Sequence, residues 1–320
     1  MTAYTAAQAE AIACLDEPLQ IIACAGSGKT QVISQRIAAI LARDGVEPRN
    51  VIAFTFTDKA AAELKERILS ILEKEGVATL GLAEMYIGTM HGYCLDLLQR
   101  LVPETFKFSV LTEITTRMLV DRNSKRSGLT TCPTNSAGTP YLRRFLHSRL
   151  YMQATSVLRE DDVDWDAIPS GVVTSFQDYM KLLYNHAYFD FTEIINLAVQ
   201  FLEGEPAEDE SAGVVQRHIR DDIRYVVVDE YQDVNPLQER LVRGLTQFAA
   251  NLCVVGDDDQ TIHQWRGSEV SNIVTFKDRS EGVHQVPLAE NLLPCSSLVE
   301  CVLSCVPPTP AVPPLSNAVV

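Results

Sequence analysis

The sequence lacks any apolar run close to the roughly 20 residues that a helix needs to span a bilayer. Its beginning, Met1-Thr2-Ala3-Tyr4, has neither the basic nor the apolar character of a secretory signal. Positive charge is scarce, with 27 Lys and Arg against 42 Asp and Glu, so a generally basic nucleic-acid-binding coat is also excluded. These absences predict a cytoplasmic protein with no membrane partner.

Metal-binding cysteine patterns are missing as well. Cys295, Cys301 and Cys305 lie close together, but neither their spacing nor any neighbouring His indicates zinc. The other cysteines that stand out lie in apolar segments, and we expect them to be reduced core residues: Cys14, Cys24, Cys94 and Cys253. With 320 residues, 46% of them hydrophobic, the chain has room for one large or two modest domains.

A loop of small residues follows the apolar run Leu19–Ile22 and precedes an amphipathic stretch from Val32 to Leu41. A strand, a glycine-containing loop and a helix in this order form a cradle for a polyphosphate, because backbone N–H groups and the helix N-terminus point at the anion. The first Gly of the usual G-x-x-x-x-G-K-[ST] pattern is Ala here. The loop residues are the candidate phosphate ligands, with Lys29 on the terminal phosphates and Thr30 on Mg²⁺: Ala23, Cys24, Ala25, Gly26, Ser27, Gly28, Lys29 and Thr30.

Two further apolar segments end in acidic residues. Tyr225–Val228 precedes Asp229 and Glu230, and we expect Asp229 to hold Mg²⁺ and Glu230 to polarise the attacking water. Asn251–Val255 precedes Gly256-Asp257-Asp258-Asp259-Gln260, where Gln260 is a candidate sensor of the γ-phosphate. Strands capped by solvated acids are the alternative interpretation, which the upstream lysine loop disfavours.

Short apolar segments alternate with helical patterns, which predicts an α/β doubly wound parallel sheet with ligands at the carboxyl ends of its strands. We expect strands at 19–24, 51–56, 85–89, 224–228 and 251–255, and helices at 30–43, 58–74 and 91–101. Residues 104–203 interrupt this alternation as an inserted helical subdomain, with helices at 109–126, 139–158, 170–186 and 190–203. Sheet-domain segments are then 1–103 and 204–291, and 292–320 is a Pro-rich, divergent or disordered tail.

Aromatic and hydroxyl side chains follow other expected strands. Phe56 and Thr57 follow one, Thr89 and His91 follow another, and Trp265-Arg266 comes soon after the acidic cluster. An aromatic ring beside a cation suits base stacking on a single strand. A core position for Trp265 and a helix-start role for His91 remain alternatives.

Charge is unevenly distributed along the chain. Residues 104–155 contain eight Lys and Arg against three Asp and Glu, whereas residues 160–250 contain six against nineteen. A basic segment within an acidic protein indicates either a phosphate-binding face or a solvated helical surface. Six residues of that segment are the candidate contacts: Arg122, Lys125, Arg126, Arg143, Arg144 and Arg149.

Taken together, these motifs resemble those of the UvrD/Rep/PcrA family of superfamily 1 DNA helicases, in family order across residues 2–291. The resemblance is carried by Gln8, by the loop 23–30, and by Phe54-Thr55-Phe56-Thr57-Asp58-Lys59-Ala60-Ala61, Gly88-Thr89-Met90-His91-Gly92, Asp229-Glu230-Tyr231-Gln232-Asp233 and Val255-Gly256-Asp257-Asp258-Asp259-Gln260. It implies a P-loop NTPase (RecA-like) motor domain with a helical insert that uses ATP and Mg²⁺. The expected substrate is single-stranded and partly duplex DNA, unwound by a 3′-to-5′ translocase that works in repair or replication.

The resemblance also implies roles for individual residues. Gln8 reads the adenine edge, and Gln232 and Gln260 couple the γ-phosphate to DNA. Gln31 and Arg36, on the helix after the loop, are included among the nucleotide contacts. The single-strand track is lined by Phe56, Thr57, Thr89, His91, His263, Trp265 and Arg266.

Departures from the family pattern bear on turnover. His263 replaces a stacking Tyr, Gln31 replaces an Arg, and Asn291-Leu292-Leu293-Pro294 lacks the arginine of Asn-Tyr-Arg-Ser, a type of group worth about 10³ or more in rate. The family's second motor domain is absent, so we expect a truncated chain that binds ATP–Mg²⁺ weakly and hydrolyses it slowly. A non-catalytic nucleotide- or DNA-binding module is the alternative. A GTPase or small-molecule kinase is disfavoured, since no Asn-Lys-x-Asp motif occurs.

Overall fold

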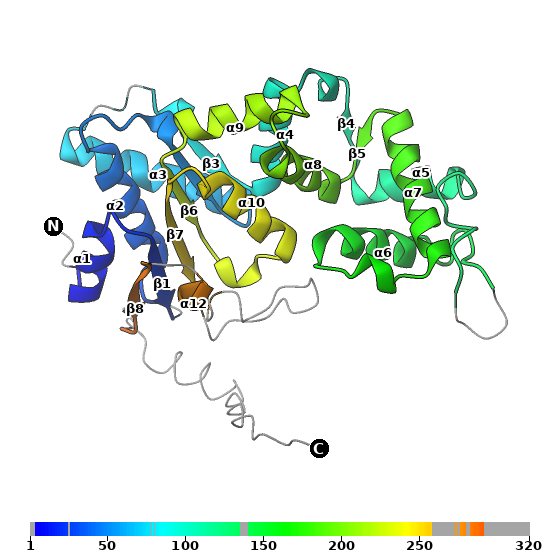
Figure 1. Cartoon of the computed structure of the whole chain (residues 1–320). Coiled ribbons are helices and arrows are strands. Elements are labelled where there is room, and N and C mark those ends of the chain that lie inside the picture. The colour runs from blue at the N-terminus through cyan, green and yellow to red at the C-terminus, as the bar shows by residue number, and fades with distance from the viewer. Residues whose placement is uncertain are drawn as a thin grey trace, which may run out of the picture.

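The computed structural model describes residues 4–24, 26–77, 79, 81–134, 140–257, 273, 276–279 and 282–290. Six strands form one sheet in the order β3-β2-β6-β7-β1-β8, and every adjacent pair is parallel (Figure 1). The strands are β1 (Leu19–Ala23), β2 (Val51–Phe54), β3 (Tyr86–Gly88), β6 (Tyr225–Val228), β7 (Asn251–Gly256) and β8 (His284–Leu288). This α/β sheet is the predicted fold class.

Helices cover both faces of the sheet, which explains why its strands are almost continuously apolar. On β6, Val226 and Val228 face one apolar core, whereas Val227 faces the other. One face is covered by α1 (Ala6–Ala13), α2 (Lys29–Leu41) and α3 (Asp58–Glu75). The other is covered by α4 (Met90–Leu101), α8 (Phe191–Glu203), α9 (Glu210–Asp222) and α10 (Pro236–Thr246).

A helical insert lies beyond α8, on the side of the sheet away from α2 (Figure 1). It contains α5 (Glu113–Arg122), α6 (Ser148–Glu160), α7 (Ser170–Asn185) and a short parallel pair, β4 (Ser109–Val110) with β5 (Tyr188–Phe189). Its small core is separate from the two cores of the sheet and is formed by Val120, Leu129, Cys132, Tyr151, Tyr179 and Leu183. The short helices are η1 (Pro48–Asn50), η2 (Leu82–Glu84), η3 (Pro103–Thr105), η4 (Trp165–Ala167), η5 (Tyr231–Asp233) and α12 (Phe276–Arg279).

Capping side chains start several helices directly after strands. Thr57 accepts a hydrogen bond from the backbone N–H of Ala60 at 3.1 Å, and Thr89 accepts one from Gly92 at 3.2 Å. A hydroxyl at this position satisfies one of the free N–H groups of the first helical turn. The polar residues that follow β2 and β3 are therefore held at the carboxyl edge of the sheet.

The structure differs from the sequence prediction in several places. The helices expected at 109–126 and 139–158 are shorter, at Glu113–Arg122 and Ser148–Glu160, and α9 and α10 were not predicted. The helix at 190–203, expected inside the insert, is α8, and its apolar residues pack in the core of the sheet domain instead. Strand β8 and the β4–β5 pair were not predicted. Within the described residues no helix has the length and apolarity to cross a membrane. Five cysteines of the described residues are outside any disulfide: Cys14, Cys24, Cys94, Cys132 and Cys253.

Candidate nucleotide site and strand-end edge

The loop between β1 and α2 has the backbone of a phosphate cradle. Gly26 and Gly28 have φ angles of 79° and 82°, in the left-handed region that suits glycine, and Gly28 is the residue that precedes the first turn of α2. The Ser27 hydroxyl is buried without a hydrogen-bond partner in the described structure. Bound phosphate would supply acceptors for such a group. Of the predicted loop ligands, Ala25 lies outside the described residues.

Lys29, the first residue of α2, lies between carboxylates from two neighbouring strands. Its Nζ is 3.5 Å from Glu230 Oε2, after β6, and 3.7 Å from Asp257 Oδ2, after β7. The Lys29 side chain is 15% exposed, and Asp257 is fully buried. Asp257 was not predicted as a site residue, although its position directly after the buried strand β7 is a signal that the sequence contains.

Gln232 connects the two acidic strand ends. Its Nε2 donates to Glu230 Oε2 at 2.7 Å, and its Oε1 accepts from the backbone N–H of Asp257 at 3.1 Å. Gln232 is only 3% exposed, and its bond from the N–H of Asp257 is buried away from water. The predicted coupling residue therefore lies between β6 and β7, beside the Lys29 ammonium.

The acidic pair after β6 is electrostatically strained. Burial and the adjacent Glu230 charge raise the pKa of Asp229 from 3.8 to about 6, against lowering contributions from a backbone hydrogen bond and from Lys29. Glu230 has a φ of 51°, a left-handed conformation that is uncommon outside glycine. Such strain and charge crowding are typical of functional sites, and a divalent cation would relieve the crowding.

Other predicted nucleotide contacts have different surroundings. The Gln8 amide is buried and donates to the backbone oxygen of Ser27 at 2.9 Å, so it contacts the cradle itself. Gln31 donates to the Tyr4 hydroxyl at 3.1 Å. Cys24 Sγ lies 3.5 Å from the backbone oxygen of Leu288, on β8.

Arg36 belongs to helix packing, which corrects its inclusion among the nucleotide contacts. The side chain is fully buried, and its guanidinium donates to the backbone oxygens of Ala11 and Cys14 and to Asn251 Oδ1. Asn251 begins β7, at the edge of the sheet opposite the phosphate loop. We therefore leave Arg36 out of the candidate site.

The residues predicted to contact single-stranded DNA after β2 and β3 lie at one edge of the sheet, because β2 and β3 are neighbours. Phe56 is 42% exposed, and Thr57 and Thr89 begin α3 and α4. His91 is partly buried, and burial lowers its pKa. Its ring contacts Phe191 edge-on, with 5.6 Å between centroids.

Phe191 was not predicted to belong to this edge. It is the first residue of α8 and is 50% exposed, although it contacts His91. An exposed aromatic directly after the capping Asp190 is a signal that the sequence does contain. Gln260, His263, Trp265 and Arg266 lie outside the described residues, as do residues 291–320.

The basic segment lies on the surface of the insert. The structure records no ion pair for any of these side chains within the residues it describes, and the Arg144 guanidinium lies 4.3 Å from the centre of the Phe145 ring. All six predicted contacts are exposed: Arg122, Lys125, Arg126, Arg143, Arg144 and Arg149.

Comparison with known proteins identifies the family. Residues 4–281 match the family described as UvrD/REP helicase N-terminal domain. The chain belongs to this helicase family. The match covers the phosphate loop and the paired carboxylates after β6, two of the motifs that carried the earlier resemblance, and it extends across the insert.

Curated relatives are ATP-dependent DNA helicases. The chain is 33% identical over 297 residues to the ATP-dependent DNA helicase PcrA of Bacillus subtilis, covering 89% of this chain and 36% of the relative. It is 30% identical over 292 residues to the protein of the same name from Staphylococcus aureus strain Mu50, covering 89% and 37%. The chain therefore spans little more than a third of the length of these relatives.

Proposed function

We propose that this chain is the ATP-binding part of a DNA helicase that translocates 3′ to 5′ on a single strand and acts in DNA repair or replication. The observation that carries the proposal is the meeting of Lys29, Glu230 and Asp257 at the mouth of a glycine-containing loop. Family membership supports the helicase class. Direction and pathway rest on the resemblance. A DNA substrate and five cysteines outside any disulfide favour a cytoplasmic location.

The proposed work is divided among residues of three strand ends. The loop amides and Lys29 bind the phosphates, and Glu230 orients and deprotonates the attacking water. Gln232 links Glu230 to the end of β7. Through this link, the presence of the γ-phosphate affects the edge of the sheet that binds single-stranded DNA. Gln8 stays in the proposal as the adenine contact, and Gln260 as the γ-phosphate sensor.

Mg²⁺ fits this site as a partner of the nucleotide. Thr30 and Asp229 would hold it, and the described residues contain no cluster of three or more His, Cys, Asp or Glu side chains able to bind a metal without the nucleotide. Mg²⁺ is usually bound in this way, by one or two side chains together with substrate phosphates. Once bound, it would neutralise negative charge on the phosphates.

Binding and turnover are tested separately. We expect the chain to bind ATP–Mg²⁺ weakly and to hydrolyse ATP slowly, with some stimulation by single-stranded DNA. Glu230→Gln should keep nucleotide binding and reduce stimulated hydrolysis by about 10²- to 10⁴-fold, as expected for loss of a general base. Glu66→Gln, on the exposed surface of α3, is the matched control. Stimulated hydrolysis that survives in Glu230→Gln would rule out the assigned base.

A non-catalytic module that binds nucleotide or DNA is the second candidate. It is favoured by Asn291-Leu292-Leu293-Pro294, which lacks the arginine of the family's Asn-Tyr-Arg-Ser. Under this alternative, ATP–Mg²⁺ and single strands bind, but no strand-stimulated hydrolysis occurs in the wild type. Single-turnover hydrolysis with labelled ATP distinguishes the two.

A further inference from the structure

The insert and the sheet domain have separate apolar cores. The insert core lies among α5, α6 and α7, whereas the apolar side chains of α8 pack in a core of the sheet domain. The two bodies meet at several places: α6 contacts both α8 and α10, and Phe189 of β5 is buried in the core of the sheet domain. One of these places is the first turn of α8. What joins them there is a group of buried polar side chains.

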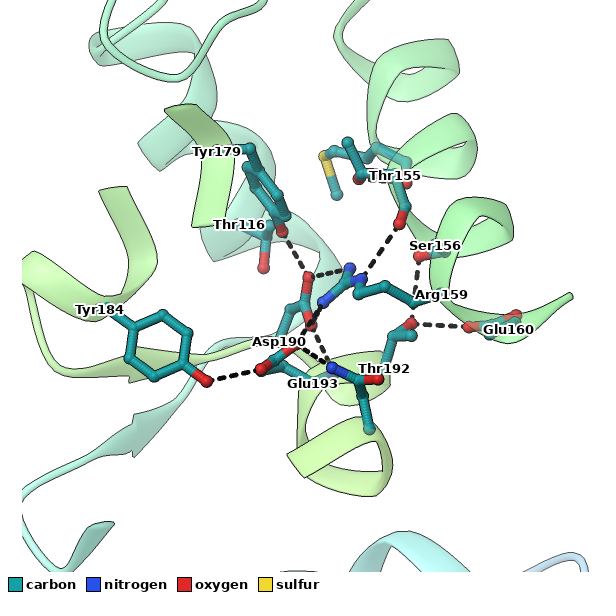
Figure 2. Close-up of polar contacts among 12 residues, drawn as sticks. Thr116, Thr155, Ser156, Arg159, Glu160, Tyr179, Tyr184, Asp190, Thr192 and Glu193 are labelled. Atoms are coloured by element: carbon teal, nitrogen blue, oxygen red, sulfur yellow. Dashed lines mark hydrogen bonds and ion pairs between the residues drawn. The ribbon is translucent and has the colours of Figure 1, made fainter. Parts of the chain in front are cut away.

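Arg159, near the C-terminal end of α6, is the centre of this group. It is 6% exposed, and its Nη1 and Nη2 donate to the two carboxylate oxygens of Asp190 at 2.8 and 2.7 Å (Figure 2). Nη1 also donates to Glu193 Oε2 at 3.1 Å, and Nε donates to the backbone oxygen of Thr155 at 3.0 Å. A planar guanidinium that binds a carboxylate through both nitrogens accepts only a narrow range of orientations.

Helix α7 joins the same turn of α8. The Tyr179 hydroxyl donates to Asp190 Oδ2, and the Tyr184 hydroxyl donates to Glu193 Oε1 at 2.6 Å (Figure 2). Thr192 adds a second contact to α6, because its hydroxyl donates to Glu160 Oε1 at 2.6 Å. Two helices of the insert are thus attached by directional bonds to three residues of one turn.

The charges of the group depend on Arg159. Burial favours the neutral carboxyl, yet the charge and hydrogen bonds of Arg159 lower the pKa of Asp190 below its usual value. At Glu193 burial outweighs Arg159 and raises the pKa. Arg159 is the cation that faces both carboxyl groups, and losing it would leave buried negative charge without a partner.

The same turn carries Phe191, which lies between Asp190 and Glu193 in sequence and is half exposed beside His91. Apolar contacts alone would let the insert slide on α8, whereas the bidentate pair selects one orientation. We propose that Arg159 is a positioning residue that fixes the insert, with its exposed cations, relative to the Phe191–His91 edge. Its consequence for DNA binding rests on the function proposed above.

The first test measures orientation directly, without DNA. Spin labels are attached through azide-bearing residues at Lys59, on α3, and Gln153, on α6, and double electron–electron resonance gives the distance distribution between them. We expect one narrow distribution in the wild type and a broader one in Arg159→Met and Arg159→Lys, because neither side chain forms the bidentate pair. Arg43→Met is the matched control, since Arg43, just after α2 in the sheet domain, pairs with Asp16 at 2.7 Å.

A neutral variant keeps the test decisive if Arg159→Met fails to fold. Arg159→Met combined with Asp190→Asn and Glu193→Gln removes the buried charges together, so that no carboxylate is left unpaired. We expect this triple variant to fold and still to show the broad distribution. A narrow distance distribution like that of the wild type in the folded triple variant would overturn the proposal. It would show that these polar side chains do not set the orientation of the insert.

Binding measurements give the functional readout. We expect single-strand affinity to fall about tenfold in the triple variant, a size typical of coupling between sites, with ATP–Mg²⁺ affinity unchanged. If the triple variant shows a broad distance distribution but binds single-stranded DNA with wild-type affinity, the orientation of the insert does not affect DNA binding. A wild type that binds no strand would refute the proposed function instead, while the distance measurement would still decide the role of Arg159.

Discussion

Replacing Gln232 by Met isolates the link between the two acidic strand ends. Methionine fills a similar volume but cannot replace either hydrogen bond, the one to Glu230 Oε2 or the one from the N–H of Asp257. A hydrogen bond to a charged group contributes about 1.5–3 kcal/mol and a buried N–H left without its acceptor costs about 1–3 kcal/mol, but the two losses overlap. We expect the free energy of unfolding to fall by about 2–3 kcal/mol, which corresponds to a Tm lower by about 4–8 °C.

Thermal unfolding and ATP hydrolysis stimulated by single-stranded DNA test this prediction together. Gln238→Met is the control, because the Gln238 side chain only accepts a capping bond from Asn235 at 3.1 Å, a contact worth about 1 kcal/mol or less. ATP–Mg²⁺ should still bind Gln232→Met, whereas stimulation by single strands should be lost. A wild-type Tm in Gln232→Met, or normal stimulation of its ATP hydrolysis by single-stranded DNA, would show that Gln232 does not connect the ends of β6 and β7.

Three further outcomes are expected. The raised pKa of Asp229, about 6, means that the native state holds this proton more tightly than the unfolded chain, so the resulting stability is lost as pH rises from about 4 to about 6. Asp229→Asn should therefore raise the Tm of the nucleotide-free protein more at pH 8 than at pH 5; an equal change at both, measured by scanning calorimetry, would contradict this. Phe191→Ala should weaken single-strand binding by about 1–3 kcal/mol in a fluorescence titration, whereas Phe106→Ala should not. Neutralising Arg122, Lys125 and Arg126 should flatten the salt dependence of DNA binding, and an unchanged slope would make them a solvated face.

The parallel sheet could be predicted because buried strands with both faces covered are continuously apolar. Strand β6 contains the uninterrupted apolar run Val226-Val227-Val228, and Asp229 and Glu230 directly after it mark the end of the strand. The phosphate loop was predictable for a related reason, since its glycines and Lys29 are adjacent in sequence. Five of the six strands of the sheet were expected within two residues of their observed bounds.

The rest depends on contacts between distant segments. Strand β8 is short and contains Pro287, which is tolerated because β8 is an edge strand that pairs with β1 within the described sheet. Arg159 and Asp190 are 31 residues apart, and nothing local marks the arginine as buried. Arg36 was misassigned for the same reason, because its acceptors on α1 and β7 are not sequence neighbours.

The strand order has a consequence for synthesis of the chain. Strand β1 is made first, yet its partners in the sheet are β7 and β8, with Leu19 paired to Cys253 and to His284. At about 5–20 residues per second, β1 leaves the ribosome roughly 10–50 s before either partner exists. The phosphate loop is therefore among the last parts of the protein to become ordered. Nascent chains that end before β7 should expose the apolar strand β1 to chaperones.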